Sequence, residues 1–443
     1  MNLEWGHRGS APLPREECLD FRQRHDFASD GAVRAHLGAA LPGGGIHGWE
    51  VFNVWYFPRR LLEVVYRITC AAGDDLLVSV RFQRPGHSPA AFEKAYRTAA
   101  NPAAVLHLRE WEAVAWVFPE DPELGRIGSP VAASPVCSVL SGATGLNLAP
   151  AQMGWTLLSY LPGKRCTVRV RWPSAPLGFV GKLGEGAGPN HGRMLALWEC
   201  RGRGFGMPQP VFCDPVAELR WESFVAGSRV EEFSGEVGFA TAVERIAPGL
   251  ASLHAMKLPG LAREGPERVL DRLRRKVIPR VCGALPALAP AAQAVAATLE
   301  EKLAGLPPGA SCTLHGDLHT ANVLVDGDAT MFIDLDNLTQ GDPAYDLSML
   351  ATRLILGAAL GGVERELAGR MVEALPQFYR SAGGVPIPDG LYAWYIAANL
   401  AGRQAKTCVR HHAPGMAVIV PWLLAVAART LERGRFEPAV LGD

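Results

Sequence analysis

Residue types that bind metal ions and phosphate gather in one stretch, residues 311–350, which reads SCTLHGDLHTANVLVDGDATMFIDLDNLTQGDPAYDLSML. Within it, Asn322 follows Asp317 by five residues and Asp334 follows Asp317 by seventeen. Carboxylate and amide oxygens are ligands that Mg²⁺ prefers, and bound Mg²⁺ usually keeps part of its coordination shell for phosphate oxygens. The three side chains therefore indicate a magnesium–phosphate site, provided that the fold brings them together.

A short β-hairpin is the element that would bring these side chains together. Residues 323–325 and 331–333 are apolar runs of strand type, and residues 326–328 between them read Asp-Gly-Asp, a turn sequence. In such a hairpin, two of the three oxygen-bearing side chains precede the first strand and the third follows the second strand. All three would then lie in one small volume at the open end of the hairpin.

Three submotifs of this stretch resemble a family signature. Residues 315–322 (HGDLHTAN), 333–336 (IDLD) and 341–347 (GDPAYDL) are similar, in order and spacing, to the signature of the aminoglycoside phosphotransferase and choline kinase family. Members of this family are small-molecule kinases with a protein-kinase-like fold. Gly316 replaces the arginine of the protein-kinase catalytic loop, which favours the small-molecule branch. A chance acidic hairpin on a solvated face is the alternative, and three linked motifs argue against it.

The resemblance implies transfer of the γ-phosphoryl group of ATP to a hydroxyl group of a small molecule. In this reaction Asp317 would accept or orient the hydroxyl proton, while Asn322 and Asp334 would hold Mg²⁺ against the phosphates. ATP and Mg²⁺ are therefore the expected cofactors. The residues expected to support the catalytic loop, a second metal ion or the acceptor side are His315, Asp336, His319 and Asp346.

Lys182 is the candidate for the cation that holds the α- and β-phosphates. It ends a predicted strand, and kinases place such a lysine on an inner strand, held by an acidic residue of a following helix. Glu199 lies in the next helical stretch and Glu185 in the intervening glycine-rich loop, so either could pair with Lys182. An ordinary surface lysine is the alternative, and the catalytic stretch favours the functional interpretation because it calls for such a lysine.

Residues 218–227, which read ELRWESFVAG, are similar in position to the last N-lobe strand and the hinge between the lobes. Backbone N–H and C=O groups of such a hinge bind the adenine edge in the family. Glu222, Phe224 and Val225 are therefore candidate adenine-binding residues. A plain interdomain strand is the alternative, because side-chain identity matters little at a hinge.

The resemblance also implies the fold class, which is α+β and protein-kinase-like, with an antiparallel-sheet N-lobe and a mainly helical C-lobe. The chain has 443 residues, too many for one simple core, so two or three domains are expected. We expect an N-terminal extension or cap with a β-hairpin over residues 1–150. The kinase N-lobe and hinge would follow over residues 151–227, and the helical C-lobe with the catalytic loop over residues 228–443.

Two stretches of the N-terminal half read alike. Residues 56–60 (YFPRR) and 160–164 (YLPGK) each precede an alternating strand pattern, and the strands that return end near Arg81 and Lys182. A degenerate internal duplication is one explanation. The other is that two antiparallel hairpins obey the same patterning rules, and a single pair of similar segments favours this second explanation.

The composition narrows the class of partner. Lysine plus arginine and aspartate plus glutamate both number 44, so no general attraction to nucleic acid or to an acidic membrane surface is expected. The nine cysteines form no CxxC pair, which indicates a reducing compartment and no zinc site. The N-terminus has no apolar core of a signal peptide, and the apolar run 416–428 is too short for a membrane span. A soluble, cytoplasmic protein is the expectation.

The sequence leaves the acceptor open among sugars, amino alcohols and aminoglycosides. The long N-terminal extension is similar to that of sugar-kinase members, which favours a sugar-like acceptor. The basic run at residues 403–412 could face an anionic acceptor, but a solvated surface is the preferred interpretation. A catalytically inactive nucleotide-binding regulator is the alternative function, and the complete set of Lys182, Asp317, Asn322 and Asp334 argues against it. A protein kinase is disfavoured because no Ala-Pro-Glu motif follows.

Overall fold

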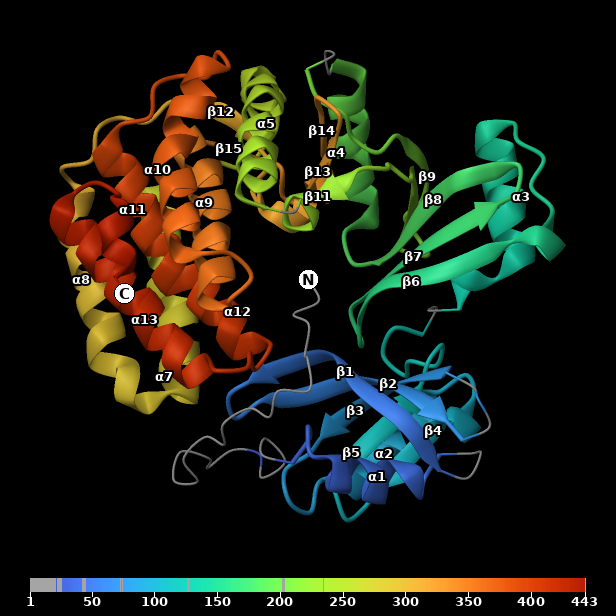
Figure 1. Ribbon diagram of the computed structural model, residues 1–443. Coiled ribbons are helices and arrows are strands. Elements are labelled where there is room, and N and C mark those ends of the chain that lie inside the picture. Colours follow the sequence, from blue (N-terminus) through green and yellow to red (C-terminus); the bar gives the residue numbers. More distant parts are fainter. Residues whose placement is uncertain are drawn as a thin grey trace.

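The computed structural model describes residues 21, 26–41, 45–71, 73, 75–125, 128–200, 204–233 and 235–442. The expectation of a missing signal peptide concerns the N-terminal residues 1–20, which lie outside the described residues. Figure 1 shows two antiparallel sheets and a group of helices arranged around the middle of the molecule. In the described part of the chain, no helix is both long enough and apolar enough to cross a membrane.

The first sheet is antiparallel and follows the strand order β1-β2-β3-β5-β4. Alternate residues of its second strand, Leu62, Val64, Tyr66 and Ile68, are fully buried in one core, and Val65 packs in another core on the opposite face. The elements of this part are α1 (Asp30–Gly38), β1 (Ile46–Phe57), β2 (Leu61–Cys70), β3 (Asp75–Phe82), α2 (Ser88–Thr98), β4 (Val105–Leu108) and β5 (Ala113–Val117).

The second sheet is also antiparallel and follows the order β6-β7-β8-β10-β9. Its inward face buries Cys166, Val168 and Val170 of one strand against Trp221 of another. Helix α3 (Ala133–Thr144) packs on this core. The other elements are β6 (Gly154–Leu161), β7 (Arg165–Trp172), β8 (Ala175–Gly184), α4 (Ala187–Cys200), β9 (Pro210–Asp214) and β10 (Leu219–Ser223).

The two sheets have the same strand order, and each inserts a helix between its third and fourth strands. Their β-turns match as well. Arg59 in the β1–β2 turn and Gly163 in the β6–β7 turn both adopt positive φ, 59° and 66°. Glu112 before β5 and Glu218 before β10 do the same, with φ of 46° and 52°. Positive φ is uncommon outside glycine, so the matched pair of glutamates is the informative one.

Backbone hydrogen bonds at the sheet ends repeat the correspondence. The N–H of Gln83 donates to the carbonyl of Glu112 at 2.7 Å, and the N–H of Gly184 donates to Glu218 at 2.9 Å. Arg81 and Lys182 each stand two residues before those donors. Patterning rules alone do not produce matched left-handed residues and matched bonds. The structure therefore favours an internal duplication. The sequence alone had favoured the other explanation, common patterning rules.

The remainder of the chain is mainly helical. Two small sheets, of order β11-β13-β14 and β12-β15, lie among the helices. The expected hairpin is confirmed, since Val323 of β13 pairs with Phe332 of β14. The elements are β11 (Ser228–Arg229), α5 (Gly235–Ala255), α6 (Pro266–Arg272), α7 (Ile278–Ala284), α8 (Ala289–Leu303), β12 (Cys312–Leu314), β13 (Val323–Asp326), β14 (Ala329–Phe332), β15 (Thr339–Gly341), α9 (Pro343–Ala359), α10 (Arg365–Ser381), α11 (Asp389–Asn399), α12 (Ala405–Arg410) and α13 (Met416–Arg433).

The first sheet touches both other parts of the molecule. In Figure 1 it lies below helix α12 on one side and below strands β6 and β7 on the other. His411, just after α12, contacts the carbonyl oxygen of Val54 through Nδ1 at 3.0 Å. The Phe57 ring lies 4.3 Å from the Arg280 guanidinium and 5.8 Å from the Lys164 ammonium. Strand β1 and its turn thus bridge the helical part and the second sheet.

The expected fold class is confirmed. Antiparallel sheets make up the N-terminal part and helices most of the C-terminal part. The boundaries at residues 150 and 227 stay predictions. The long connection between β5 and β6 includes the first boundary, and the short segment between β10 and β11 includes the second.

Candidate active site

The loop from β12 to β13 carries Asp317 and is held by a buried carboxylate. Asp346 in the first turn of α9 is fully buried and accepts the backbone N–H groups of His315 at 2.7 Å and Gly316 at 3.0 Å. Gly316 has φ 75°, and a β-carbon there would lie 2.0 Å from the carbonyl oxygen of Asn337. Glycine is therefore the residue that this loop geometry admits.

The Asp317 carboxylate lies among polar partners at the edge of a cavity. It forms an ion pair with Arg403, and the Nδ2 of Asn337 lies 3.5 Å from its Oδ2. His319 Nε2 is 3.8 Å from Oδ1. Burial and the Arg353 charge lower the pKa of His319 to about 3, so this histidine is neutral at ordinary pH and adds no charge.

His315 supports the loop that carries Asp317. Its Nε2 lies 3.1 Å from the carbonyl oxygen of Ile333, and its Nδ1 accepts the backbone N–H of Asp317 at 3.3 Å. Burial lowers its pKa despite the nearby Asp346 and Asp334 charges. A neutral, buried ring with both nitrogens occupied positions the loop and is not placed to transfer protons.

Asn322 and Asp334 stand at the open end of the β13–β14 hairpin. The N–H of Ile333, next to Asp334, donates to the carbonyl of Asn322 at 3.0 Å, so the two residues are neighbours across the hairpin. Asp334 adopts the left-handed conformation, with φ 59° and ψ 47°. Such conformations persist where the surrounding structure holds them, and they cluster at functional sites.

Lys182 contacts two carboxylates from different parts of the chain. Its Nζ is 2.9 Å from Glu222 and 3.5 Å from Asp334. Burial lowers the pKa of Lys182, but the two carboxylates raise it above its ordinary value. Burial raises the pKa of Asp334, whereas Lys182 and Arg165 lower it to about 2. Both groups are therefore charged at neutral pH.

The prediction that Glu199 or Glu185 pairs with Lys182 was wrong. Among the described residues the lysine pairs with Glu222, while Glu199 is exposed near the end of α4 and Glu185 lies in the turn after β8. Lys182 stands opposite Arg220 in the β8–β10 pairing, so Glu222 is its diagonal neighbour two residues on. Diagonal neighbours on one sheet face lie within reach of long side chains, but only the strand register identifies them.

Glu222 has a role that the sequence did not predict, while adenine binding by its backbone stays a prediction. Its backbone belongs to β10, and its buried carboxylate binds Lys182. Phe224 and Val225 lie in the segment between β10 and β11, where the hinge was expected. The N–H of Phe224 donates to the Gly178 carbonyl at 3.1 Å, so this amide serves the sheet. Adenine binding at Phe224 and Val225 stays a prediction.

Asp336 is held by arginines that the sequence did not single out. Its carboxylate forms an ion pair with the buried Arg220, and its carbonyl oxygen accepts a hydrogen bond from Arg193 at 3.2 Å. These contacts link β10 and α4 to the loop after β14. Only the strand register places Arg220 opposite Lys182, so the sequence does not identify this pair or the carboxylate that it binds.

The expected magnesium site has a donor set that fits the ion. In the parts of the chain that the structure describes, no group of three or more histidine, cysteine, aspartate or glutamate side chains could hold a metal ion. Mg²⁺ needs only one or two protein oxygens when phosphates and water complete its shell. The Nδ2 of Asn322 donates to the Asp317 carbonyl at 3.0 Å, so the amide oxygen is the atom that would bind the ion beside Asp334.

A cavity of about 420 Å³ adjoins Asp317 on the helical side. The one-turn π-helical segments Leu273–Val277 and Leu400–Gln404 contribute to its wall. The expectation of a solvated surface for the basic run is wrong for Arg403 and Lys406, which line this cavity. The charged residues of its wall are Arg193, Glu264, Arg272, Asp317, Asp336, Arg403 and Lys406.

Comparison with known proteins agrees with the motifs. Residues 190–405 match the model of the phosphotransferase enzyme family, APH. This segment begins in α4 and ends at the start of α12, so it includes the Asp317 loop and excludes the first sheet. The resemblance to this family is confirmed, and it supports a phosphotransferase that acts on small molecules. A search of curated proteins finds no match.

Solved structures of low sequence identity are similar to this chain. One is a choline/ethanolamine kinase family protein from Mesorhizobium loti, with 16% identity, a TM-score of 0.46, and coverage of 71% of this chain and 97% of that one. Choline kinase LicA from Streptococcus pneumoniae has 14% identity, a TM-score of 0.46, and coverage of 67% and 98%. Macrolide 2'-phosphotransferase MphH from Brachybacterium faecium has 19% identity, a TM-score of 0.43, and coverage of 71% and 98%.

Proposed function

We propose that this protein is a small-molecule kinase that transfers the γ-phosphoryl group of ATP to a hydroxyl of a sugar-like acceptor. The observation that carries the proposal is the Lys182 ammonium held between Glu222 and Asp334. Such a lysine, buried and fixed in its charged form, is suited to the α- and β-phosphates. Asp317 lies in the loop before the hairpin, at the edge of the cavity, where an acceptor hydroxyl would be in reach.

The transfer forms a bond between the acceptor oxygen and the γ-phosphorus. It breaks the bond from the γ-phosphorus to the β,γ-bridging oxygen, which leaves on ADP with the bonding electrons. The acceptor hydroxyl gives its proton to Asp317. Asn322 and Asp334 would hold Mg²⁺, which supplies positive charge next to the phosphate oxygens. Lys182 would bind the phosphates from the sheet side.

Asp317 has to exchange partners before it can accept that proton. One of its oxygens is engaged by Arg403, and Asn337 lies 3.5 Å from the other. A carboxylate already paired with a guanidinium is a weaker base. Binding of the acceptor must therefore draw the Arg403 side chain away or share it.

ADP release from ATP and Mg²⁺ with a panel of sugars, sugar acids, amino sugars and polyols tests the proposal. Asp317→Asn should lower kcat by at least about 100-fold, because a general base contributes that much, while ATP binding persists. Asp328→Asn is the control, since Asp328 is almost fully exposed in the hairpin turn. ATP binding without phosphorylation of any acceptor would instead identify an inactive nucleotide-binding regulator.

A further inference from the structure

The cavity beside Asp317 carries more positive than negative side chains that are available to a ligand. Its three carboxylates are already engaged by arginines: Glu264 by Arg272 at 2.9 Å, Asp317 by Arg403, and Asp336 by Arg220. A cationic acceptor would find no uncommitted carboxylate in the described wall of this cavity. The ammonium of Lys406, in contrast to these carboxylates, is available to an incoming ligand.

Lys406 lies on α12, three residues after Arg403, and is partly buried in the cavity wall. In the described part of the chain, no carboxylate or carbonyl oxygen pairs with its ammonium. Burial and four surrounding guanidinium groups lower its pKa to about 7. The arginines responsible are Arg410, Arg403, Arg280 and Arg272. A partly buried cation among like charges has a strong electrostatic preference for an incoming anion.

We propose that the acceptor bears an anionic group, a carboxylate or a phosphate, and that Lys406 and Arg403 bind this group. The inference rests on the proposed function, because it names the class of acceptor for the Asp317 site. It also accounts for the partner exchange at Asp317. When the anionic group binds Arg403, the guanidinium leaves the Asp317 carboxylate, which is then free to receive the hydroxyl proton. An acceptor without the anion leaves Arg403 on Asp317.

This assignment selects among the acceptors that the sequence left open. Amino alcohols and aminoglycosides carry ammonium groups, which Lys406 and its arginine neighbours would repel. A neutral sugar would bring no counter-charge to Lys406 and the arginines around it. A sugar acid or a sugar phosphate supplies both a hydroxyl for Asp317 and a counter-charge for Lys406. The volume of about 420 Å³ accommodates a molecule of this size.

Sulfate binding tests the anion site without any turnover. Calorimetric titration of sulfate is performed on the full chain with saturating ADP and Mg²⁺, so that the nucleotide phosphate positions are occupied. Lys406→Met should weaken sulfate binding about 10- to 100-fold, as expected for loss of a charged hydrogen bond. Lys302→Met, at an exposed lysine of α8, should bind like the unaltered protein. Lys406→Arg retains the charge and should retain most of the binding.

Equal sulfate affinity in the unaltered protein and in Lys406→Met, or no sulfate binding at all, would overturn the anion site. Thermal unfolding of Lys406→Met shows whether that variant is folded. If Lys406→Met does not fold, the same comparison is decided by Lys406→Gln against Lys406→Arg, which differ in charge and keep a polar side chain.

Matched acceptors test the substrate class. Glucuronate, glucose 6-phosphate, glucose and glucosamine share a ring and hydroxyls but differ in charge, and glycerate, glycerol 3-phosphate and glycerol do the same for a small skeleton. Anionic members should exceed their neutral partners in kcat/KM by at least about tenfold, and the carboxylate and phosphate members show which anion is preferred. The inference is overturned if a neutral or cationic member has a kcat/KM equal to or above that of its anionic partner. Sulfate binding with no turnover of any member would leave the anion site standing and the proposed function refuted.

Discussion

At the scale of single residues, the pair formed by Lys182 and Glu222 is the feature on which the proposed nucleotide binding depends. Glu222→Gln removes the closest counter-charge of a buried lysine, which should raise the KM for ATP about tenfold and change kcat less. The measurement is steady-state kinetics with ATP varied. Glu199→Gln is the control, because Glu199 is exposed and was a partner predicted from the sequence. A rise in KM in Glu199→Gln equal to that in Glu222→Gln would refute the pairing.

Gly316 offers a second prediction at this scale. Gly316→Ala puts a β-carbon 2.0 Å from the Asn337 carbonyl oxygen at a φ of 75°, so strain and steric clash add. The free energy of unfolding should fall by about 3–5 kcal/mol, which urea denaturation measures. Gly327→Ala is the matched control, because its φ is 56° but nothing lies within 4 Å of its β-carbon. A loss in Gly316→Ala no larger than that in Gly327→Ala would show that the loop relaxes around the methyl group.

The residues of the candidate site differ in how far the sequence reveals them. Asp317, Asn322 and Asp334 lie in one short stretch, so local spacing and one hairpin suffice to bring them together. Glu222 and Arg403 reach the same site only through strand register and the packing of α11 and α12. Register depends on which side chains face the core on both strands, and the sequence of one strand does not contain that information.

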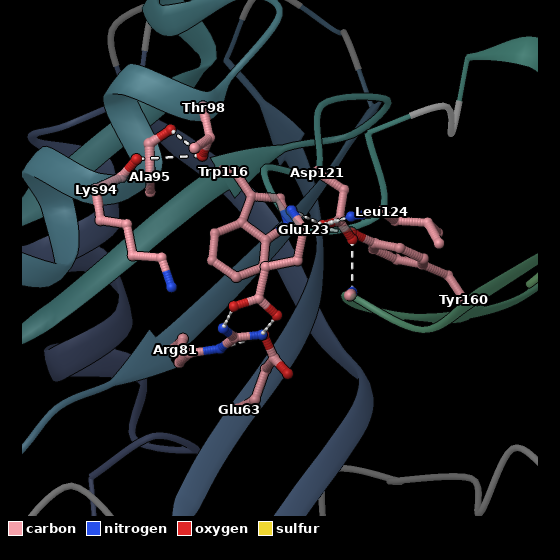
Figure 2. A network of polar contacts seen from close by, with 11 residues as sticks. Glu63, Arg81, Lys94, Ala95, Thr98, Trp116, Asp121, Glu123, Leu124 and Tyr160 are labelled. Carbon is pink, nitrogen blue, oxygen red and sulfur yellow. Dashed lines mark hydrogen bonds and ion pairs between the residues drawn. The ribbon is translucent and has the colours of Figure 1, made fainter. Parts of the chain in front are cut away.

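At the scale of elements, the β6–β7 turn is held by an aspartate from the connection that follows the first sheet. Asp121 accepts the backbone N–H of Gly163 at 2.7 Å and the hydroxyl of Tyr160 at 2.8 Å. Figure 2 shows Tyr160 and Asp121 directed toward one another, with Trp116 beside them. Under the proposed function this turn covers the nucleotide phosphates, so the connection after the first sheet would support that cover.

Asp121→Asn should therefore loosen the turn. The loss of two hydrogen bonds to a charged acceptor should raise the KM for ATP severalfold to about tenfold, while acceptor KM changes little. Asp214→Asn is the control, because Asp214 caps the neighbouring β9–β10 turn through the N–H groups of Val216 and Ala217. Equal effects of the two substitutions on ATP would show that the Gly163 turn does not contact the nucleotide.

At the scale of the whole molecule, a partly buried ion cluster joins the first sheet to the connection that leads into the second. Arg81 donates to Glu63 at 3.1 Å and to Glu123 at 3.0 Å, and Figure 2 shows its guanidinium between the two carboxylates. Burial raises the pKa of Glu63 from 4.5 to about 7, although Arg81 opposes the shift, while Asp121 and Glu123 add to it. The folded protein thus holds a proton that the unfolded chain releases at lower pH.

The raised pKa of Glu63 makes the free energy of unfolding depend on pH. Between pH 4.5 and about 7 the unfolded state binds fewer protons at Glu63 than the folded state, so this group's contribution to stability falls as pH rises. Glu63→Gln cannot titrate. Its free energy of unfolding relative to the unaltered protein should therefore rise between pH 5 and 8 by up to about 3 kcal/mol. Glu50→Gln, at an exposed ion pair of the same sheet, should show no such trend. A flat difference for Glu63→Gln would mean that Glu63 stays ionised against Arg81.

The repeated strand order also has a consequence for synthesis on the ribosome. The first sheet emerges before the second, and neighbouring repeats of one topology are liable to exchange strands while they fold. A β8 strand that paired with β5 in place of β10 would find Trp116 where Lys182 now meets Glu222, by the correspondence of the two sheets. The Lys182 ammonium would then be buried without a counter-charge. We therefore expect the difference between Trp116 and Glu222 at this position to disfavour the mispaired chain.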